Sequence, residues 1–487
     1  MKYVLGIDFG GGASKATLLR EDGKIVATSG TEYETFTTAD GGREQNPNDW
    51  VNATFINIKN VLEASGVDGN DVECFCFDAA THTAVLLDEN FRIVRNSVYW
   101  TDTRSEKEKE YLKENFGKDI FEKFKHNVDT IWTLPELLFL KNTEPENYSK
   151  IKKITFAKDY VRHVFTGDFV TDYIEAEGSM FFDFDKKCWD KKYLDVLGLD
   201  ESYLPKVVNP EAFVGTIKSD VAKKLGINKN AKVICGTTDT AMEVFAAGAI
   251  KKGQTTIKLA TAGRICVVSD KIVPDDNIIN YSHIVDGLSY PGTATKSCAQ
   301  SLRWFRDTFG GDYAEMDEKA KTVPTGCDGL MFHPYLNGEL TPYGNPKLKA
   351  SFIGISGTHK RAHFIRAVME GVAMSMLDCK KYLEAKGITM TSAFIIGGGA
   401  KSKVWPQILC DALNIELIKT ENNDSSFGSA MLAGIASGFF KDKKDALDRC
   451  SKITGKVVPD MDNNKKYEKL FIKYKTVQKA LAEIYGA

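Results

Sequence analysis

The N-terminus carries the pattern that most restricts the fold: an apolar run, a glycine turn and a second apolar run. Residues 3–7 form a short apolar segment that ends at Asp8, and three glycines follow at 10–12. Residues 15–19 and 25–27 are largely apolar again, and an Asp-Gly pair typical of tight turns separates them. The sequence therefore predicts three strands joined by tight turns.

A weaker copy of this pattern lies in the second half of the chain. Residues 255–259 and 264–268 read as two strands around a turn of small residues. Two such hairpins suggest two similar halves, and the helical spacing of apolar residues at 50–63, for example, predicts α/β layers. We place the boundary between an N-terminal domain, 1–246, and a C-terminal domain, 247–487. A helix is expected to close the chain near 465–485.

Charge and cysteine content exclude several classes of function. The 487 residues carry a formal charge of −2, so no global basic field points to nucleic acid or to an anionic membrane. The ten cysteines are scattered, which favours buried free thiols over a disulfide framework or a zinc site. The N-terminus lacks a signal-peptide pattern, and no apolar stretch approaches the roughly 20 residues that span a bilayer. We expect a cytoplasmic protein.

Three turns of small residues could bind phosphate groups through their backbone N–H groups. At the first turn Asp8 adds a carboxylate that could hold hydrated Mg²⁺, although an ordinary glycine hairpin with a solvated aspartate would look the same. The second turn is Thr261-Ala262-Gly263. The third is Gly397-Gly398-Gly399-Ala400, between an apolar strand at 393–396 and a helix expected to start near Ser402. A single glycine turn is weak evidence, but three in one chain favour a nucleotide site.

Other residues follow predicted strands and could contact a substrate. Asp239 comes directly after a strand at 232–236, where it could accept a proton from a hydroxyl or simply cap the next helix. His82 follows a strand at 72–78 and could bind a ligand or be an internally satisfied buried histidine. Residues 100–104, with Trp100, Asp102 and Arg104, suit either a polyhydroxylated substrate or a surface salt bridge.

Along nearly its whole length the sequence resembles the FGGY family of carbohydrate kinases, and within it the xylulokinase-like pentulose kinases. The motifs that carry this resemblance are Gly6-Ile7-Asp8, Glu44-Gln45, Leu86-Leu87-Asp88, residues 100–104, Lys158-Asp159-Tyr160, Thr166-Gly167-Asp168, Asp239, the triple glycine, residues 350–355, His363-Phe364 and residues 367–370. The most specific of them is the stretch at 350–370.

The resemblance implies an actin-like ATPase fold, with two RNase H-like domains around a central cleft. It also implies transfer of the γ-phosphoryl group of MgATP to a sugar hydroxyl, with Asp239 as the catalytic base and with Asp8 and Asp239 near the metal. Expected nucleotide contacts are Asp8, Gly10, Gly11, Lys15, Thr261, Ala262, Gly263, Gly397, Gly398, Gly399, Ala400 and Ser402. Expected sugar contacts are Thr81, His82, Trp100, Asp102, Arg104, Asp239 and Thr240.

Departures from the family pattern cluster where the sugar is expected. Ala80-Thr81-His82-Thr83 replaces the usual Gln-Met-His-Gly, and Thr240 replaces an asparagine. Gly11 stands where threonine is usual, Arg264 where a small or apolar residue is usual, and Glu136 and Phe139 where lysine and tryptophan are expected. The parts that would transfer phosphate are thus mostly kept, whereas the expected sugar pocket is altered.

The substrate predicted on this basis is a ketopentose, D-xylulose first. Another ketose, a polyol or a sugar acid, of the ribulose, glycerol or gluconate type, is the alternative, because a few pocket groups decide such differences. A non-catalytic sugar or nucleotide sensor, or a chaperone-like ATPase, is the alternative from another class. We expect sugar and ATP as the partners, with no nucleic acid or membrane, and a homodimer is compatible with the resemblance.

Overall fold

The computed structural model describes residues 1–486, and within it the chain forms two compact units. Unit 1 consists of Met1–Gly248, Tyr281–Gly287 and Asn422–Ser451, and unit 2 of Ala249–Asn280, Leu288–Glu421 and Lys452–Ala487. The first change of unit lies two residues after the boundary expected at 246/247. Two later segments, however, return to unit 1, which a single boundary in the sequence does not anticipate.

Unit 1 is built on a seven-stranded sheet in the order β14-β15-β6-β1-β2-β3, with β16 also paired to β6. Its strands are β1 (Tyr3–Phe9), β2 (Ala13–Arg20), β3 (Ile25–Glu32), β6 (Val72–Ala79), β14 (Phe213–Thr216), β15 (Lys232–Ile234) and β16 (Thr237–Thr238). The first three strands are antiparallel, β6 and β15 run parallel to β1, and β14 is antiparallel to β15. The N-terminal strands predicted from the glycine turn are confirmed.

Unit 2 repeats this plan in a six-stranded sheet, β19-β18-β17-β22-β23-β24. Its strands are β17 (Gln254–Leu259), β18 (Gly263–Val267), β19 (Gly292–Thr295), β22 (Ser392–Ile396), β23 (Leu417–Thr420) and β24 (Ile453–Val457). Strand directions follow the same succession as in unit 1: three antiparallel strands, two parallel ones and a final antiparallel edge. The two similar halves suggested by the paired hairpins are therefore present as two sheets of one topology.

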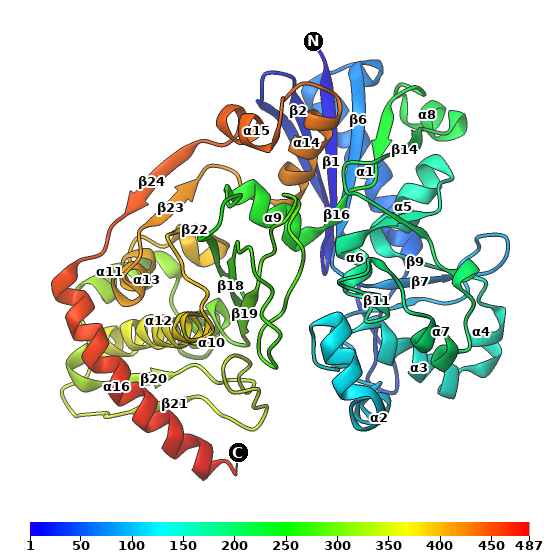
Figure 1. Cartoon of the computed structure of the whole chain (residues 1–487). Coiled ribbons are helices and arrows are strands. Elements are labelled where there is room, and N and C mark those ends of the chain that lie inside the picture. The colour runs from blue at the N-terminus through cyan, green and yellow to red at the C-terminus, as the bar shows by residue number, and fades with distance from the viewer. Residues whose placement is uncertain (487) are drawn as a thin grey trace. The chain divides into compact units, whose positions relative to one another are not determined.

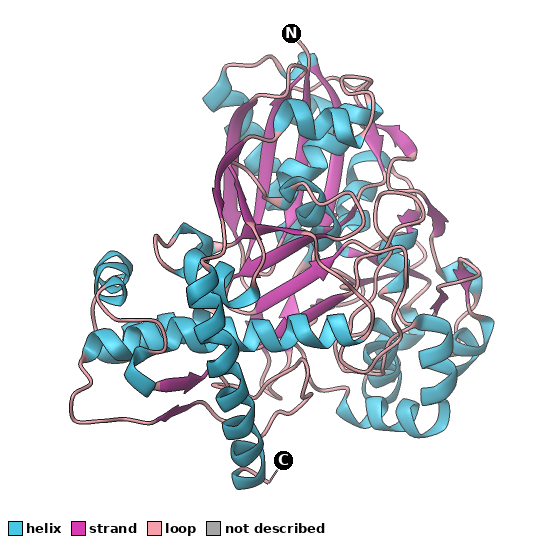
Figure 2. Cartoon of the chain, turned by 60° about the vertical axis from the view of Figure 1, so that its left-hand side comes forward, coloured by secondary structure: helices cyan, strands magenta, loops and turns pink. Residues whose placement is uncertain are grey.

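Helices cover these sheets, as Figure 2 shows for the strands and helices near the N-terminus. In unit 1 they are α1 (Pro47–Ser65), α2 (Glu106–Phe124), α3 (Thr133–Thr143), α4 (Pro145–Lys150), α5 (Ala157–Thr166), α6 (Tyr173–Glu177), α7 (Lys191–Leu197), α8 (Ser219–Leu225), α9 (Asp239–Ala247), α14 (Ser425–Ala436) and α15 (Lys443–Cys450). In unit 2 they are α10 (Ala299–Phe309), α11 (Tyr313–Lys321), α12 (Arg361–Ala385), α13 (Trp405–Leu413) and α16 (Met461–Ile484). The predicted closing helix corresponds to α16.

Short strands complete both units. In unit 1, β4 (Phe36–Thr37), β5 (Arg43–Gln45) and β8 (Ser97–Val98) form a small sheet, and the pairs are β7 (Ala84–Leu87) with β9 (Lys153–Phe156), β10 (Val170–Asp172) with β13 (Lys206–Val208), and β11 (Phe182–Asp183) with β12 (Cys188–Trp189). In unit 2, β20 (Met331–His333) pairs with β21 (Ser351–Ile353).

Helix α14 packs directly on the central strands of unit 1 (Figure 1). A Cβ atom at Gly6 in β1 would lie 2.0 Å from the carbonyl oxygen of Ser426 and 2.2 Å from the nitrogen of Ala430. Only a residue without a side chain allows two backbones to approach this closely. The opposite face of the same sheet packs on α1 and α5, where Trp50 and Phe165 are buried.

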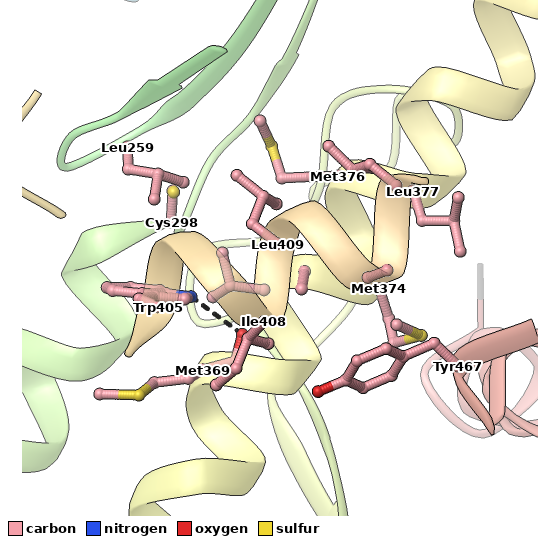
Figure 3. Packing of buried hydrophobic residues seen from close by; sticks show 14 of the residues in the cluster. Leu259, Cys298, Met369, Met374, Met376, Leu377, Trp405, Ile408, Leu409 and Tyr467 are labelled. Atoms are coloured by element: carbon pink, nitrogen blue, oxygen red, sulfur yellow. Dashed lines mark hydrogen bonds between the residues drawn. The ribbon is translucent and has the colours of Figure 1, made fainter. Parts of the chain in front are cut away.

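The core of unit 2 surrounds Trp405 at the start of α13 (Figure 3). Trp405 is 1% exposed and packs among residues of α12 and α13, including Met369 and Ile408. Its indole N–H donates to the carbonyl oxygen of Met369 over 3.0 Å, so the polar atom of this large apolar side chain is satisfied.

The cysteines are free thiols throughout residues 1–486, as expected, and most of them are buried. Cys188 is an exception to the expected burial: it is exposed, because its two-residue strand β12 lies at the surface of a short hairpin. Cys450 is half-buried. In the same described part of the chain, no helix is both long and apolar enough to cross a membrane.

We predict that Gly6→Ala destabilises the protein by about 3 kcal/mol or more, because its methyl group would push α14 off β1. Gly30→Ala in β3 of the same sheet is the matched control, since the nearest atom to its Cβ would be 3.8 Å away. Thermal unfolding of the two variants checks this. Equal unfolding temperatures for both variants would contradict the close packing at Gly6.

A buried histidine in unit 2 should make stability depend on pH. His333 is fully buried, stacks on Tyr474 with ring centroids 4.1 Å apart, and has its pKa lowered by burial from 6.5 to about 4. Between these values the unfolded chain binds a proton that the folded chain refuses, so stability falls as the pH falls from 6.5 towards 4. The loss from His333 alone is about 2 kcal/mol between pH 7 and pH 5.

We therefore expect His333→Gln to lose less stability than wild type between these two pH values, as measured by chemical unfolding at pH 7 and pH 5. The same acid-induced loss in both proteins would show that His333 is not the group responsible.

Candidate active site

Asp8 and the glycine turn lie at the end of β1 in unit 1. Neighbouring segments hold the backbone of this turn in place by donating hydrogen bonds to its carbonyl oxygens. The hydroxyl of Tyr33 donates to the Gly10 oxygen over 2.5 Å, and the Gln45 amide donates to the Gly11 oxygen over 3.0 Å. The turn predicted from three consecutive glycines is thus an ordered structure rather than a loose loop.

A second carboxyl group, which the sequence analysis did not identify, lies beside Asp8. Asp78 is the residue of the parallel strand β6 that pairs in register with Asp8. Asp8 is 6% exposed and Asp78 is fully buried, and Ser429 of α14 donates a hydrogen bond to Asp78 over 2.5 Å. Burial raises the pKa of Asp8 to about 7, with a further contribution from the charges of Asp424 and Asp239. Burial, together with the charge of Asp8, raises the pKa of Asp78 well above its usual value.

Lys15 on β2 brings a positive charge to this group of carboxylates. Its ammonium group contacts a carboxylate oxygen of Asp424 at 2.5 Å. Burial alone would raise the pKa of Asp424, but the charge and hydrogen bond of Lys15 outweigh it, and the pKa of Asp424 is lowered. Asp424 also caps α14 by accepting from the backbone N–H of Ser426. Lys15 was among the predicted nucleotide contacts, whereas Asp424 was not identified.

Asp239 lies at the start of α9, directly after β16. Strand β16 pairs in parallel with β6, where Thr237 lies opposite Asp78. The N-cap of α9 is Thr238, whose hydroxyl accepts from the N–H of Ala241. Asp239 therefore does not serve as the N-cap residue, which was the alternative explanation for an acid at this position. Its carboxylate accepts from the backbone N–H of Thr240 over 2.5 Å and remains only half-buried.

His82 lies in a tight turn after β6 and has a left-handed backbone, with φ of 53°. Its N–H donates to a carboxyl oxygen of Glu175 over 2.5 Å, and its carbonyl oxygen accepts from the Thr133 hydroxyl over 2.8 Å. The His82 ring is 5% exposed and packs on Trp132, with centroids 4.9 Å apart. Thr81, its neighbour in the turn, is half-buried. Glu175 and Thr133 were not identified from the sequence.

Asp102 and Arg104 bind each other instead of projecting free charges. Arg104 contacts Asp102 at 2.9 Å and Glu44 at 2.7 Å, and Asp102 also accepts from the backbone N–H of Arg43 over 2.7 Å. Of this predicted group only Trp100 presents a large exposed surface, at 43%. The salt-bridge alternative is thus present, as an ion network that is mostly buried, and contact of these residues with a substrate stays a prediction.

The departures Glu136 and Phe139 lie around this network. The guanidinium group of Arg104 lies 5.3 Å from the centroid of the Phe139 ring. Burial raises the pKa of Glu136 well above its usual value, and the charge of Asp102 adds to that effect. Phe139 thus lies against the Arg104 guanidinium group, and Glu136 is close enough to Asp102 to be affected by its charge.

In unit 2 the second turn connects β17 to β18. Thr261 and Ala262 are exposed, and Gly263 is buried. The N-terminus of α10 fixes the turn, because the N–H of Cys298 donates to the Thr261 oxygen over 3.0 Å and that of Ala299 to the Ala260 oxygen over 2.8 Å. The two exposed residues are the ones whose amide and hydroxyl groups were predicted to meet phosphate.

The triple-glycine turn lies beside the same strand end. A Cβ at Gly397 would meet the Leu259 carbonyl oxygen at 2.7 Å, and one at Gly399 would meet the Leu259 Cβ at 2.8 Å. Unit 2 therefore brings Gly397, Gly398, Gly399 and Ala400 to the end of β17 from which Thr261 also extends.

The helix after these glycines begins later than predicted. Residues Gly398–Lys401 form a short 3-10 turn, and α13 starts at Trp405. The hydroxyl of Ser402 accepts from the N–H groups of Val404 and Trp405 and donates to Asp317 over 2.6 Å. Ser402 thus lies before α13 and satisfies backbone N–H groups at the start of that helix.

The residues around Asp8 fit a magnesium ion by their chemistry. Mg²⁺ prefers carboxylate oxygens from one or two residues together with substrate phosphates and water. One carboxyl oxygen of Asp8 and one of Asp78 are buried without a donor from any other residue, and the two carboxyl groups lie close enough to share a hydrogen bond. Within residues 1–486, no group of three or more His, Cys, Asp or Glu side chains is arranged to hold a metal by itself.

Comparison with known proteins places this arrangement in a family. Residues 3–246 match the N-terminal domain of the FGGY family of carbohydrate kinases, and residues 279–437 match its C-terminal domain. The chain is 32% identical to a xylulose kinase of Bacillus subtilis over 482 residues, which covers 98% of this chain and 97% of that protein. It is 28% identical to a gluconokinase of the same organism, with 96% and 94% covered.

Solved structures agree. A ligand-bound xylulose kinase from Lactobacillus acidophilus has a TM-score of 0.93 and 26% identity, with 100% of this chain and 99% of that chain covered. A gluconate kinase from the same organism gives the same score, identity and coverage. This likeness confirms the expected actin-like ATPase fold. Kinases of this family use ATP as a substrate besides the sugar. The chain belongs to the FGGY family of carbohydrate kinases.

Proposed function

We propose that this kinase transfers the γ-phosphoryl group of ATP to a hydroxyl group of a ketopentose, with D-xylulose as the first candidate. The observation that carries the catalytic part is the position of Asp239, a carboxylate that follows a strand end beside Asp78 and is not used as a helix cap. The xylulose kinases among the relatives and similar structures favour the sugar. A binding-only sensor would not need a base at this position.

A sugar acid is the second candidate substrate. Gluconokinases match the chain over 94% or more of their length, and a gluconate kinase has the same TM-score as the xylulose kinase of its organism. The residues that depart from the xylulokinase pattern, Ala80, Thr81, Thr83 and Thr240, lie around the expected sugar position and are the ones that would decide between the two.

In the proposed mechanism Asp239 accepts the proton as the sugar hydroxyl attacks the γ-phosphorus. Such a base needs to be ionised and reachable, and Asp239 is half-buried, with one oxygen held by the Thr240 N–H. The proposed sugar contacts are Thr81, His82, Trp100, Asp102, Arg104, Asp239 and Thr240. Asp102 and Arg104 would also hold the shape of that region through their mutual ion pair.

Each predicted nucleotide contact is proposed to meet one part of the nucleotide. We assign the phosphates to the backbone of Gly10 and Gly11, to Lys15 and to the turn of Thr261, Ala262 and Gly263. The glycines at 397–399, with Ala400 and Ser402, are assigned to the adenosine. Asp8, with Asp239 nearby, would hold Mg²⁺, which offsets the charge of the phosphates when bound. A cytoplasmic location, a homodimer and the absence of nucleic-acid or membrane partners stay predictions.

One departure in the phosphate turn has a physical explanation. A Cβ at Gly11 would lie 2.5 Å from the hydroxyl oxygen of Tyr99. The space that the family's usual threonine would need is therefore occupied by Tyr99, which is 7% exposed.

We predict that Asp239→Asn lowers kcat about 10³-fold, which corresponds to about 4 kcal/mol of barrier, because the neutral amide cannot accept the proton. The measurement is ADP release from ATP and Mg²⁺ with D-xylulose, ribulose, pentitols, glycerol and gluconate, each compared with a sugar-free background.

Sugar-dependent turnover that the variant loses is the expected result, and the best substrate then decides between ketopentose and sugar acid. If Asp239→Asn keeps near wild-type turnover, the proposed base is wrong. If no sugar raises the wild-type rate above the background, the binding-only alternative is favoured.

We also predict that Gly11→Ala impairs nucleotide binding in the wild-type background but much less in a Tyr99→Phe background, since removal of the hydroxyl leaves the ring carbon at 3.4 Å. The KM for ATP should rise at least fivefold in the single variant and at most twofold in the double variant relative to Tyr99→Phe. Equal effects in the two backgrounds would contradict a steric conflict with Tyr99.

A further inference from the structure

Helix α6 carries acidic side chains that are almost completely buried. Asp172, which caps the helix, and Glu175 and Glu177 within it are each at most 1% exposed. Burying a carboxyl group lowers the stability of the folded state unless the group has a charged or hydrogen-bonding partner. Each of these three acids therefore needs a partner or a function that explains its burial.

Asp172 and Glu177 have partners of opposite charge. Asp172 contacts the ammonium group of Lys158 at 2.8 Å, and Glu177 contacts that of Lys187 at 2.5 Å. Asp172 also accepts from the hydroxyl of Thr237 over 2.7 Å, and Glu177 accepts from the backbone N–H of Ser282 over 2.9 Å. Helix α6 thereby reaches the strand that precedes Asp239.

Glu175 differs from its two neighbours. Its side chain accepts from the backbone N–H of His82 over 2.5 Å, and its other carboxyl oxygen is buried without a hydrogen-bond partner. Burial raises the pKa of Glu175 well above its usual value, although the charge of Lys158 opposes this. A costly buried carboxyl is thus directed at one peptide group of the His82 turn.

That peptide group needs to be held. His82 has a left-handed backbone, which is uncommon for a residue with a side chain and costs free energy that the surrounding contacts must offset. Glu175 holds its N–H and Thr133 holds its carbonyl oxygen, while the ring rests on Trp132. The direction of the imidazole is therefore set from outside the turn.

The end of α6 also touches this turn directly. A Cβ at Gly178 would lie 2.8 Å from the His82 Cδ2 atom and 3.1 Å from the Thr81 Cγ2 atom. Since Gly178 has an ordinary right-handed backbone, with φ of −72°, the lack of space is what favours glycine here.

We propose that Glu175 is a positioning residue for sugar binding, which acts by fixing the His82 peptide and, with it, the side chains of Thr81 and His82. This inference rests on the proposed function, because it takes the His82 turn as part of the sugar site. Helix α6 then aligns the sugar turn through Glu175 and the Asp239 segment through Asp172 and Thr237.

The test measures KM for D-xylulose, or for the best sugar of the panel, and KM for ATP in four variants. Glu175→Ala should raise the sugar KM at least tenfold and leave the ATP KM within twofold. Glu175→Gln should stay within threefold for the sugar, because its amide oxygen can still accept from the His82 N–H. Gly178→Ala, which displaces the same turn without removing the carboxyl, should also raise the sugar KM tenfold.

Glu177→Gln is the matched control, since it alters an equally buried acid on the same helix that does not contact the His82 turn. Its sugar KM should stay within twofold of wild type. Thermal unfolding of all four variants separates loss of stability from loss of position.

The inference is overturned if Glu175→Ala or Gly178→Ala binds the sugar as wild type does, or if Glu177→Gln raises the sugar KM as strongly as Glu175→Ala. Should Glu175→Ala not fold, Glu175→Leu takes its place, because it keeps a side chain of similar size that cannot accept from the His82 N–H, and the same rise in sugar KM is expected. A wild-type enzyme without any sugar-dependent turnover would instead overturn the proposed function, and this inference with it; an active wild type with insensitive variants overturns only the role of Glu175.

Discussion

The direct contact between the backbones of α14 and β1 at Gly6 is the constraint on which the site in unit 1 depends. It brings a helix from residues 425–436 onto strands from the first 80 residues. From this helix Ser429 reaches Asp78, and the capping residue Asp424 reaches Lys15. The acidic group around Asp8 is thus assembled from three distant parts of the chain, and the helix that completes it can approach only because Gly6 has no side chain.

Two sheets of one topology put the phosphate-binding candidates at equivalent places. In each unit the turn between the first two strands of the repeat carries small residues: Gly10 to Gly12 after β1, and Ala260 to Ala262 after β17. The surroundings differ, because the first turn lies beside buried carboxyl groups and the second beside the N-terminus of α10. The same turn therefore lies beside acidic side chains in unit 1, whereas in unit 2 it presents exposed backbone amides and the Thr261 hydroxyl.

Several carboxyl groups near the predicted sugar and metal positions of unit 1 are buried. Asp8, Asp78 and Glu175 all have raised pKa values because burial disfavours their charged forms. Such groups lower stability relative to apolar residues of similar size, so they are expected where function requires them. Arg104 and Asp102 differ from these carboxyl groups, because each of the two buried charges is paired with a charge of opposite sign.

The sequence by itself was sufficient for the elements that depend on local pattern. The apolar runs and the glycines of β1 and β2 encode two strands and a turn within some 20 residues, so Asp8 and the first turn could be located without a structure. The resemblance to the kinase family could likewise be read from motifs, since these are contiguous. Only the tertiary structure decided which distant residues complete the site. Asp78, Asp424 and Glu175 carry no local signal, because an aspartate at a strand end, a helix cap and an acid in a five-residue helix look ordinary in sequence. Their roles follow from strand register and helix packing, which join positions from 70 to 409 residues apart and are determined by the burial of the whole core.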